Sequence, residues 1–275
     1  MKQNRLNRLF NAESGRCIDI ALDHGVFGEA EFISGIEDLP AMVHAMAAAR
    51  PDALQLTIGQ ASLLQSKPGR DKPALVLRTD LANVYGRRLP DRLFSAMVED
   101  AAMAAVRLDA ACVVVNLLDI PGRAEVHEAC IRNVLSLRAA CEQVGMPMMV
   151  EPLVMRPNEE LGGYMSEGDT AKVIGLVRQA VELGADVIKA DPTDSLDDYH
   201  LVIQAARVPL LVRGGGRVGD EELLTRTQEV LAQGAAGIVY GRNIVQHPNP
   251  VGILNSLQAV VHRRAQASEA LASLR

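Results

Sequence analysis

One sequence pattern recurs along the chain: a helical segment ends, glycine or aspartate with alanine follows, and a short apolar run begins. It occurs at residues 50–57, 108–115, 183–189 and 233–240. A glycine after a helix adopts the left-handed conformation at little cost. An apolar run of four or five residues without alternation is typical of a strand that is covered on both faces. The repeated pattern therefore predicts buried parallel strands that alternate with helices.

Four further apolar runs have the same character, and they bring the number of expected strands to eight. They lie at residues 17–22, 74–77, 147–150 and 208–212. Segments with helical periodicity lie between most of the strands, at residues 91–107, 125–144, 169–183 and 220–233. Pro250 opens another helix through His262, and we expect the tail to Arg275 to be peripheral.

This alternation predicts an α/β fold, a closed (β/α)₈ TIM barrel that spans residues 1–275 as a single domain. Residues 1–10 are expected to form a short amphipathic helix in front of it. An open doubly wound sheet is the alternative, because periodicity alone does not show closure. However, no Gly-x-Gly-x-x-Gly follows the first strand, so the commonest reason for an open sheet is missing.

Composition argues against several classes of protein. The chain has 275 residues, 48% of them apolar, and a formal net charge of −6. Nucleic-acid binding needs a clustered basic surface, and no apolar run approaches the roughly 18 residues of a membrane helix. The four cysteines form no Cys-x-x-Cys pair and are expected to be buried, reduced thiols. We therefore expect a cytoplasmic protein with neither a nucleic-acid nor a membrane partner.

In a parallel barrel the active site lies at the carboxyl ends of the strands, so the residues that end each apolar run matter most. Most of these ends are polar. They are Asp23-His24-Gly25, Arg78 with Asp80, Asn116, Glu151, Lys189 with Asp191, Arg213-Gly214-Gly215-Gly216 and Gly241-Arg242-Asn243.

Lys189 is the most informative of these residues. Lysine is almost never fully buried without a partner, yet Lys189 ends a buried strand pattern. A lysine attacks a carbonyl only as the neutral amine, and its ordinary pKa is about 10.4. Apolar walls or a nearby cation would lower that pKa. The pattern predicts a Schiff-base lysine, and the alternative is a structural ion pair with Asp23 or Asp191.

Two glycine turns predict a phosphate site. Gly214, Gly215 and Gly216 follow the seventh strand, while Gly241 and Arg242 follow the eighth and precede a helical turn. Backbone N–H groups at such turns bind anions, and barrels commonly build a phosphate site from these two loops. Either turn alone would be a weak signal, because glycine is common in tight turns.

Several other polar residues are candidates for the same site. Glu151 could relay protons to a substrate hydroxyl, or it could be a salt-bridge partner of Lys189 or Arg78. Asp23 could hold a substrate hydroxyl or tune the lysine, and His24 could line the site or only cap its loop. Arg78 and Asn116 are expected to bind substrate. The histidines form no ligand cluster, so neither a metal nor a cofactor is expected.

With these residues in place, nearly the whole chain resembles the class I aldolase superfamily that includes archaeal-type fructose-bisphosphate aldolase, tagatose-bisphosphate aldolase and the autoinducer-2-processing thiolase. The motifs that carry the resemblance are Leu22-Asp-His-Gly25, Gly145-Met-Pro147, Val187-Ile-Lys189, Val208-Pro with Gly214-Gly-Gly216, and residues 234–244. The last of these, with residues 250–262, is most similar to the thiolase branch. Together, in this order and spacing, the motifs are specific.

The resemblance implies that Lys189 forms the Schiff base and that Asp23 is an active-site carboxylate. It also implies that Gly215, Gly216, Gly241 and Arg242 bind phosphate. One position departs from archaeal-type fructose-bisphosphate aldolases, which carry a tyrosine acid/base where Leu153 stands here. Glu151 instead resembles a glutamate of the tagatose-bisphosphate branch. Fructose 1,6-bisphosphate is therefore in doubt as the substrate, whereas imine formation is not.

The sequence thus predicts a carbon–carbon lyase, a homo-oligomer that cleaves a phosphorylated ketose or keto acid through an imine on Lys189. Glu151 would remove the proton from the hydroxyl whose carbon loses its C–C bond. Two alternatives remain. One is a coenzyme A-dependent thiolase acting on a phosphorylated 1,3-diketone, and the other is a non-catalytic sugar-phosphate sensor.

Overall fold

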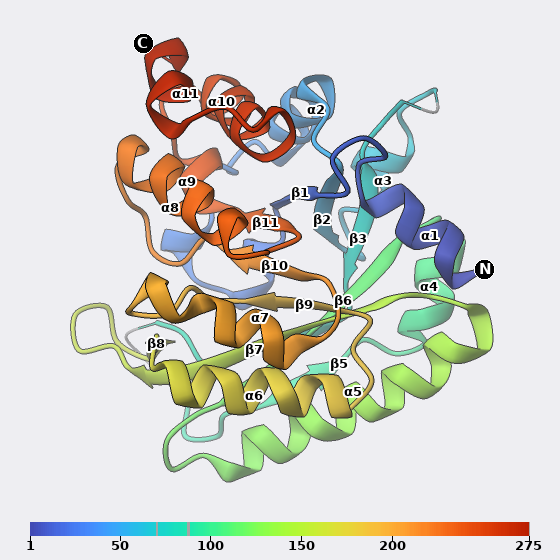
Figure 1. Cartoon of the computed structure of the whole chain (residues 1–275). Coiled ribbons are helices and arrows are strands. Elements are labelled where there is room, and N and C mark those ends of the chain that lie inside the picture. The colour runs from blue at the N-terminus through green and yellow to red at the C-terminus, as the bar shows by residue number, and fades with distance from the viewer. Residues whose placement is uncertain (70, 87–88, 275) are drawn as a thin grey trace.

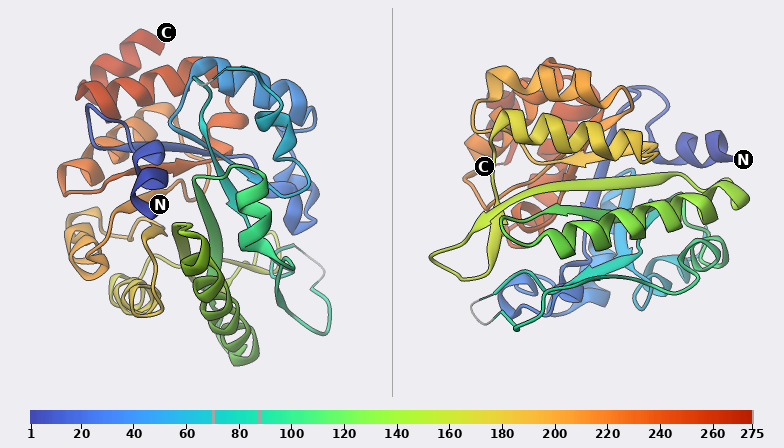
Figure 2. Two further views of the ribbon diagram at one scale, coloured as in Figure 1. Left: turned by 90° about the vertical axis from the view of Figure 1, so that its right-hand side faces the viewer. Right: turned by 90° about the horizontal axis from the view of Figure 1, so that it is seen from below.

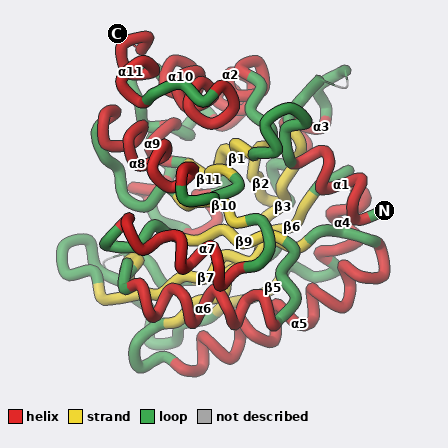
Figure 3. The backbone as a smooth tube through the Cα atoms, viewed as in Figure 1, coloured by secondary structure: helices red, strands yellow, loops and turns green. Residues whose placement is uncertain are grey.

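The computed structural model describes residues 1–69, 71–86 and 89–274, and it contains a closed barrel of eight parallel strands (Figures 1 and 3). The strands are β1 (Cys17–Ala21), β2 (Ala53–Thr57), β3 (Ala74–Arg78), β6 (Cys112–Asp119), β7 (Met148–Pro157), β9 (Val187–Ala190), β10 (Leu210–Arg213) and β11 (Gly237–Tyr240). Their order is β6-β3-β2-β1-β11-β10-β9-β7, and pairing of β6 with β7 closes the ring. All eight predicted strands are confirmed, and the open-sheet alternative is wrong. The prediction of a single domain over residues 1–275 stays a prediction, and Arg275 lies outside the described residues.

The strands are buried on both faces, which explains their unbroken apolar runs. Ile18 and Ile20 of β1 belong to the larger core beneath the surrounding helices, whereas Cys17 and Ala21 belong to the core inside the barrel. Gly237 lies where β11 closes against β1. Its φ is +145°, and a Cβ there would overlap the backbone of Cys17. Glycine at this position therefore permits the close approach of the first and last strands.

The helices form a layer around the barrel (Figure 3). The predicted helices α5 (Ala124–Val144), α6 (Thr170–Glu182), α8 (Asp220–Ala232) and α10 (Pro250–Arg263) are confirmed, and α2 (Leu39–Ala49), α3 (Ser62–Gln65), α7 (Tyr199–Ala206) and α9 (Arg242–Val245) complete this layer. Their ends follow from local chemistry. Asp169 accepts a hydrogen bond from the Lys172 backbone N–H at the start of α6, and Gly145, with φ +60°, ends α5.

One prediction about a helix is wrong. The segment 91–107 is helical only in α4 (Ala101–Arg107), because residues 95–97 form β5 (Ser95–Met97), which pairs antiparallel with β4 (Asp80–Ala82). A remote strand partner thus overrides the local helical periodicity. The tail beyond residue 263 lies at the periphery, as predicted, and it is helical. It forms α11 (Ala267–Leu274), which packs on α8 and α10 and buries Ala270.

The predicted N-terminal helix is α1 (Lys2–Leu9), which lies across the amino-terminal end of the barrel (Figure 2, left). Its Leu9 is fully buried and belongs to the core inside the barrel. Behind it, the two ring nitrogens of His262 lie 2.8 Å from Ser14 Oγ and 3.1 Å from Asp52 Oδ2. These contacts tie the loop after α1 and the residue before β2 to α10, at the end opposite the predicted active site.

β6 and β7 extend further than the sequence suggested. Asn116 and Glu151 were expected to end their strands, but β6 continues to Asp119 and β7 to Pro157. The two strands pair in register from Val113–Met148 to Asp119–Val154, so Asn116 and Glu151 face each other inside the ladder. β8 (Tyr164–Ser166) continues the pairing on the far end of β7. This extension exists because apolar residues continue beyond the polar pair and remain buried.

Candidate active site

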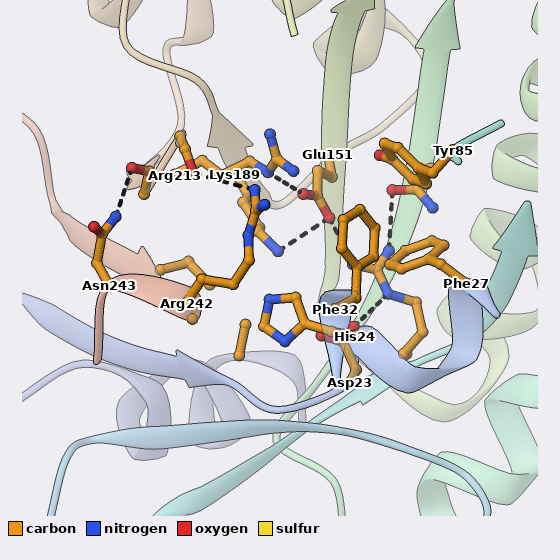
Figure 4. Close-up of a pocket in the computed structure, with 17 residues that line it drawn as sticks. Asp23, His24, Phe27, Phe32, Tyr85, Glu151, Lys189, Arg213, Arg242 and Asn243 are labelled. Carbon is orange, nitrogen blue, oxygen red and sulfur yellow. Dashed lines mark hydrogen bonds and ion pairs between the residues drawn. The ribbon is translucent and has the colours of Figure 1, made fainter. Parts of the chain in front are cut away.

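Nearly all of the predicted site residues meet in one pocket at the carboxyl ends of the barrel strands (Figure 4). The predicted residues that line it are Asp23, His24, Arg78, Asn116, Glu151, Lys189, Arg213, Gly214, Gly215, Gly241 and Arg242. Gly216 is exposed and is not among the lining residues. The strands bring together residues that lie far apart in the sequence, as the barrel fold requires.

Lys189 lies on β9 with only 4% of its surface exposed. Its Nζ lies 3.0 Å from Glu151 Oε2 and donates to Gln55 Oε1 at 3.3 Å. Gln55 in turn donates to Asp23 Oδ2 at 2.7 Å. The ion pair of the lysine is therefore with Glu151, not with Asp23 or Asp191, the two partners that the structural alternative had named.

Arg78 connects the carboxylates of the site. Its Nε donates to Asp23 Oδ2 at 2.7 Å, and its Nη2 donates to Glu151 Oε2 at 2.6 Å. Its Nη1 donates to both Asp80 and Asn116 at 3.2 Å. Four of its five N–H groups therefore donate to protein oxygens, and one guanidinium binds both Asp23 and Glu151. The charge of Arg78 is thus paired within the protein, and its predicted contact with substrate stays a prediction.

Glu151 is surrounded by cations. Besides Lys189 and Arg78, it contacts Arg213, whose Nε lies 3.0 Å from Oε1. Burial opposes ionisation of Glu151, but the three positive charges outweigh it and hold the pKa of the carboxyl well below its usual range. Arg78 and Lys189 likewise outweigh burial and lower the pKa of Asp23. Both groups are therefore carboxylates at neutral pH, able to accept a proton but weak as bases.

Arg242 differs from the other cations of the pocket. Among the residues that the structure describes, no carboxylate pairs with it, and its guanidinium lies over the Phe32 ring at 5.2 Å. Its Nη2 donates to the Gly215 carbonyl at 3.4 Å, which links the two predicted phosphate-binding turns. Asn243 strengthens that link by donating to the carbonyls of Gly214 and Gly216. The two turns thus form one unit beside an arginine that has no acidic partner there.

His24 packs directly against the second turn. A Cβ at Gly241 would overlap its ring, so glycine is needed there for the imidazole to enter the pocket. Burial lowers the pKa of His24 to about 4, and its buried Nδ1 has no hydrogen-bond partner among the described residues. His24 therefore lines the pocket as a neutral imidazole, and capping its loop is not its only contribution.

Sequence reasoning missed an aromatic wall on the opposite side of the pocket (Figure 4). Phe27, Phe32 and Tyr85 pack edge to face, with ring centroids 5.2–6.2 Å apart. Phe27 and Phe32 come from short turns after β1, and Tyr85 follows β4. Burial raises the pKa of Tyr85 to about 12, so its phenol stays protonated. No motif marks these residues, because each stands alone between elements and only the fold brings them together.

The described residues contain neither a metal-binding cluster nor a membrane-spanning helix. No group of three or more histidine, cysteine, aspartate or glutamate side chains there is placed to hold a metal ion. No helix in the same part of the chain is long and apolar enough to cross a membrane. All four cysteines are unpaired and buried, as the sequence predicted.

Comparison with known proteins identifies the family. The family model described as DeoC/LacD family aldolase matches residues 17–247. The chain belongs to the DeoC/LacD aldolase family. It is 33% identical over 280 residues to an uncharacterised aldolase of Saccharolobus solfataricus, with 98% of each chain covered. It is also 31% identical to 3-hydroxy-5-phosphonooxypentane-2,4-dione thiolase of Escherichia coli O9:H4, covering 98% of this chain and 84% of that one.

Solved structures of aldolases share the fold of this chain. An archaeal fructose 1,6-bisphosphate aldolase superposes with a TM-score of 0.76 at 22% identity, covering 96% of this chain and all of that one. A Schiff-base-forming fructose-1,6-bisphosphate aldolase gives the same TM-score at 23% identity, covering 95% and 100%. The protein is therefore an aldolase-family enzyme on a TIM barrel, and the resemblance seen in its motifs is confirmed.

Proposed function

We propose that this enzyme is a class I aldolase that cleaves or forms a C–C bond of a phosphorylated ketose or keto acid. The observation that carries the proposal is Lys189, a nearly buried lysine between Glu151 and Gln55 at the bottom of the pocket. A lysine in that position can form an imine with a substrate carbonyl. The arginine-rich opposite end of the pocket suits an anionic substrate group.

The reaction begins when Lys189 Nζ attacks the carbonyl carbon and water leaves. The protonated imine then withdraws electrons from the adjacent C–C bond. Glu151 takes the proton from the hydroxyl of the carbon that leaves as the aldehyde. Its carboxylate form is the state that this step needs, although the surrounding cations make it a weak base. Asp23 is proposed to hold a substrate hydroxyl beside the lysine, together with Asn116.

The phosphate is proposed to bind between the two glycine turns. Arg242 supplies a guanidinium that no carboxylate occupies within the described residues, and Arg213 lies at the same end of the pocket. Backbone N–H groups of Gly214, Gly215, Gly216 and Gly241 are the further candidates. Binding energy gained at the phosphate, remote from the reacting carbon, can be used to orient the carbonyl at Lys189.

The test is borohydride reduction with a panel of phosphorylated ketoses, read by intact mass and peptide mapping. We expect a stable adduct on Lys189, and we expect Lys189→Ala to lose both adduct and turnover. Lys172→Ala is the matched control, because that lysine pairs with Glu167 at the surface. An adduct on another lysine, or full activity of Lys189→Ala, would overturn the assignment.

A thiolase reaction is the second candidate, because several relatives 30–31% identical to the chain carry a thiolase name. It would transfer an acyl group from a phosphorylated 1,3-diketone to coenzyme A while keeping the imine on Lys189. Product analysis with and without coenzyme A separates the two reactions. A sugar-phosphate sensor, by contrast, would bind its ligand without borohydride trapping.

The assembly, the compartment and the domain organisation are also part of the proposal. We propose a homo-oligomer in the cytoplasm whose subunit is a single domain. Sedimentation at several protein concentrations, cell fractionation and a single unfolding transition of the subunit are the corresponding tests.

A further inference from the structure

Asp19 is a buried carboxyl that the proposed mechanism leaves without a role. It lies on β1 and is fully buried, and neither of its oxygens has a hydrogen-bond partner within the described residues. Buried polar groups in folded proteins are nearly always paired, because an unpaired one loses its hydrogen bonds to water without replacing them. An orphaned carboxyl in a barrel interior therefore calls for an explanation.

The strand register places Asp19 beneath the pocket. Alternate residues of a strand face the same side of the sheet. Asp19 therefore faces the barrel interior, as Cys17 and Ala21 do, and Asp23, which lines the pocket, continues the same series. Lys189 is the cation whose charge acts most strongly on it. The carboxyl thus lies in the barrel interior below the floor of the site.

A small residue flanks the carboxyl on the β2 side, whereas Val239 lies beside it on β11. Asp19 is in register with Ala53 on β2, and Ala53 is in register with Ala74 on β3. Ala21 is the next inward residue on β1. A single buried water needs about 10–15 Å³ and two to four polar partners, which the two Asp19 oxygens and a lysine N–H would supply. Nζ has three N–H groups, and Glu151 and Gln55 use two of them.

We propose that Asp19 exchanges a proton with Lys189 through an internal water molecule, so that it acts on the reaction through the lysine and not on substrate. The inference rests on the proposed imine at Lys189. In the forward step, the Asp19 carboxylate accepts a proton from the ammonium, which leaves a neutral amine and a carboxylic acid. After the amine has added to the carbonyl, Asp19 returns the proton through the same water to the nitrogen of the carbinolamine. The nitrogen passes it to the departing hydroxyl, which leaves as water. The proton is therefore conserved, and no further reactant is needed.

The pKa values of the carboxyl groups in the site support the assignment of this proton transfer to Asp19 and not to Glu151 or Asp23. Surrounding cations keep the pKa values of Glu151 and Asp23 low, so neither accepts a proton readily. Burial raises the pKa of Asp19 to about 7, in spite of the opposing charge of Lys189. A proton-transfer group works best when its pKa is near the working pH. Of these three carboxyls, Asp19 meets that condition.

The charged groups that act on Asp19 come from several strands. They are Lys189 on β9, Asp23 after β1, Arg78 on β3 and Glu151 on β7. The thiols of Cys17 and Cys112 lie close enough for Asp19 to raise their pKa values. The inward residues of the flanking strands, Ala53, Gln55 and Val239, do not titrate. The pH response of Asp19 is therefore set mainly by burial and by the lysine.

The experiment measures the rate of imine formation from pH 5 to pH 9 by rapid-quench borohydride trapping. Wild type should show a rate that rises through about pH 7. Asp19→Asn keeps the shape but removes the proton acceptor. It should lose that inflection and form the adduct more slowly at neutral pH, on the order of 10²-fold. Val76→Ala, which alters packing in the same interior, should keep the shape of the wild-type profile.

Thermal unfolding provides a second readout that does not depend on activity. The folded-state pKa of Asp19 lies above its ordinary value of 3.8, so its contribution to stability is present at low pH and is lost as pH rises to about 7. Asp19→Asn should therefore melt near wild type at pH 4 and above it at pH 8. This comparison also shows whether the variant folds.

Each outcome decides one of the two ideas. If wild type gives no adduct at Lys189, the proposed function fails. If wild type is trapped normally and Asp19→Asn keeps both the rate and the pH inflection, the proton-exchange role of Asp19 is wrong while the imine stands. A pH-dependent difference in melting without any change in trapping would also overturn that role, because it would make Asp19 a buried acid that does not act on the lysine.

Discussion

Arg78 is the residue on which the polar side chains of the pocket converge. One guanidinium binds Asp23, Asp80, Asn116 and Glu151, and all five side chains are nearly buried. Removing one partner of a buried charge network leaves an uncompensated charge, which typically costs about 3–5 kcal/mol. Substitutions that test the chemistry should therefore preserve shape and hydrogen bonding, so amide replacements of the acids are more informative than alanine.

Glu151→Gln separates a catalytic role from a structural one. The amide keeps the shape and can still accept hydrogen bonds, but it no longer removes a proton. A positioned acid/base is worth about 10²–10⁴-fold in rate, so C–C cleavage should slow by that factor. Adduct formation on Lys189 should persist, because the proton relay proposed for imine formation runs through Asp19 and a water molecule and does not require Glu151. Single-turnover cleavage and borohydride trapping measure the two steps separately.

Glu142→Gln is the control for that comparison. Glu142 lies half-exposed at the end of α5, where it pairs with Lys2 and Arg138, so both steps should keep wild-type rates. Turnover of Glu151→Gln within a few-fold of wild type, with an unchanged pH profile, would remove Glu151 from the mechanism and favour the thiolase reaction. Parallel loss of trapping and turnover would instead make it a structural partner of the lysine.

Arg242→Ala tests the phosphate site. A charge-assisted hydrogen bond is worth about 1.5–3 kcal/mol, which corresponds to a roughly 10- to 100-fold rise in KM for phosphorylated substrates. Dephosphorylated analogues should be little affected. Arg217→Ala is the matched control, because Arg217 follows the other glycine turn, Gly214–Gly216, but is exposed and does not line the pocket. Equal losses for both substrate types would place Arg242 outside the phosphate site.

At the scale of elements, α1 acts as a cover on the amino-terminal end of the barrel, far from the pocket. Its Leu9 is fully buried in the barrel core, so Leu9→Ala should lower the free energy of unfolding by about 2–5 kcal/mol. Leu6→Ala should cost less, because Leu6 is only partly buried. Urea denaturation measures both. The kcat of the folded enzyme should not change, and a large fall in kcat would contradict the separation of cover and site.

The elements that could be predicted from sequence are those that local chemistry determines. Gly145 ends α5 and Asp169 begins α6 through contacts within a few residues, and each strand is an apolar run that needs no partner to be recognised. The segment 91–107 could not be predicted, because β5 depends on pairing with β4, which lies more than ten residues away. Periodicity within one segment carries no information about such a partner.

The same contrast between local sequence signals and remote partners explains which residues of the candidate site could be predicted. Lys189, Arg213 and Arg242 could be found because they follow apolar runs at strand ends. Asp19 could not be recognised from sequence as a site residue, because it lies within such a run, where a single polar residue does not mark a strand end. Tyr85 comes from an irregular segment, and only the fold places it over the pocket. The ion pairs of Glu151 with Lys189 and Arg78 were among the alternatives that the sequence offered, and the structure contains both.

At the scale of the whole molecule, activity should survive chelators such as EDTA. The imine acts as the electron sink, and no cluster suited to a metal occurs within residues 1–69, 71–86 and 89–274. Turnover before and after chelation, with metal analysis of the protein, checks this expectation. Loss of activity that a divalent cation restores would reveal a metal site.

β1 and β11 lie near opposite ends of the sequence, yet they pair side by side, with Cys17 beside Gly237. During synthesis on the ribosome the ring therefore stays open until nearly the whole chain has emerged. Throughout that time one edge of β1 has no partner, and an exposed strand edge invites pairing with another nascent chain. Binding of chaperones to the nascent chain should therefore matter most before residues 237–240 leave the ribosome. After that point β11 can pair with β1 and cover its free edge.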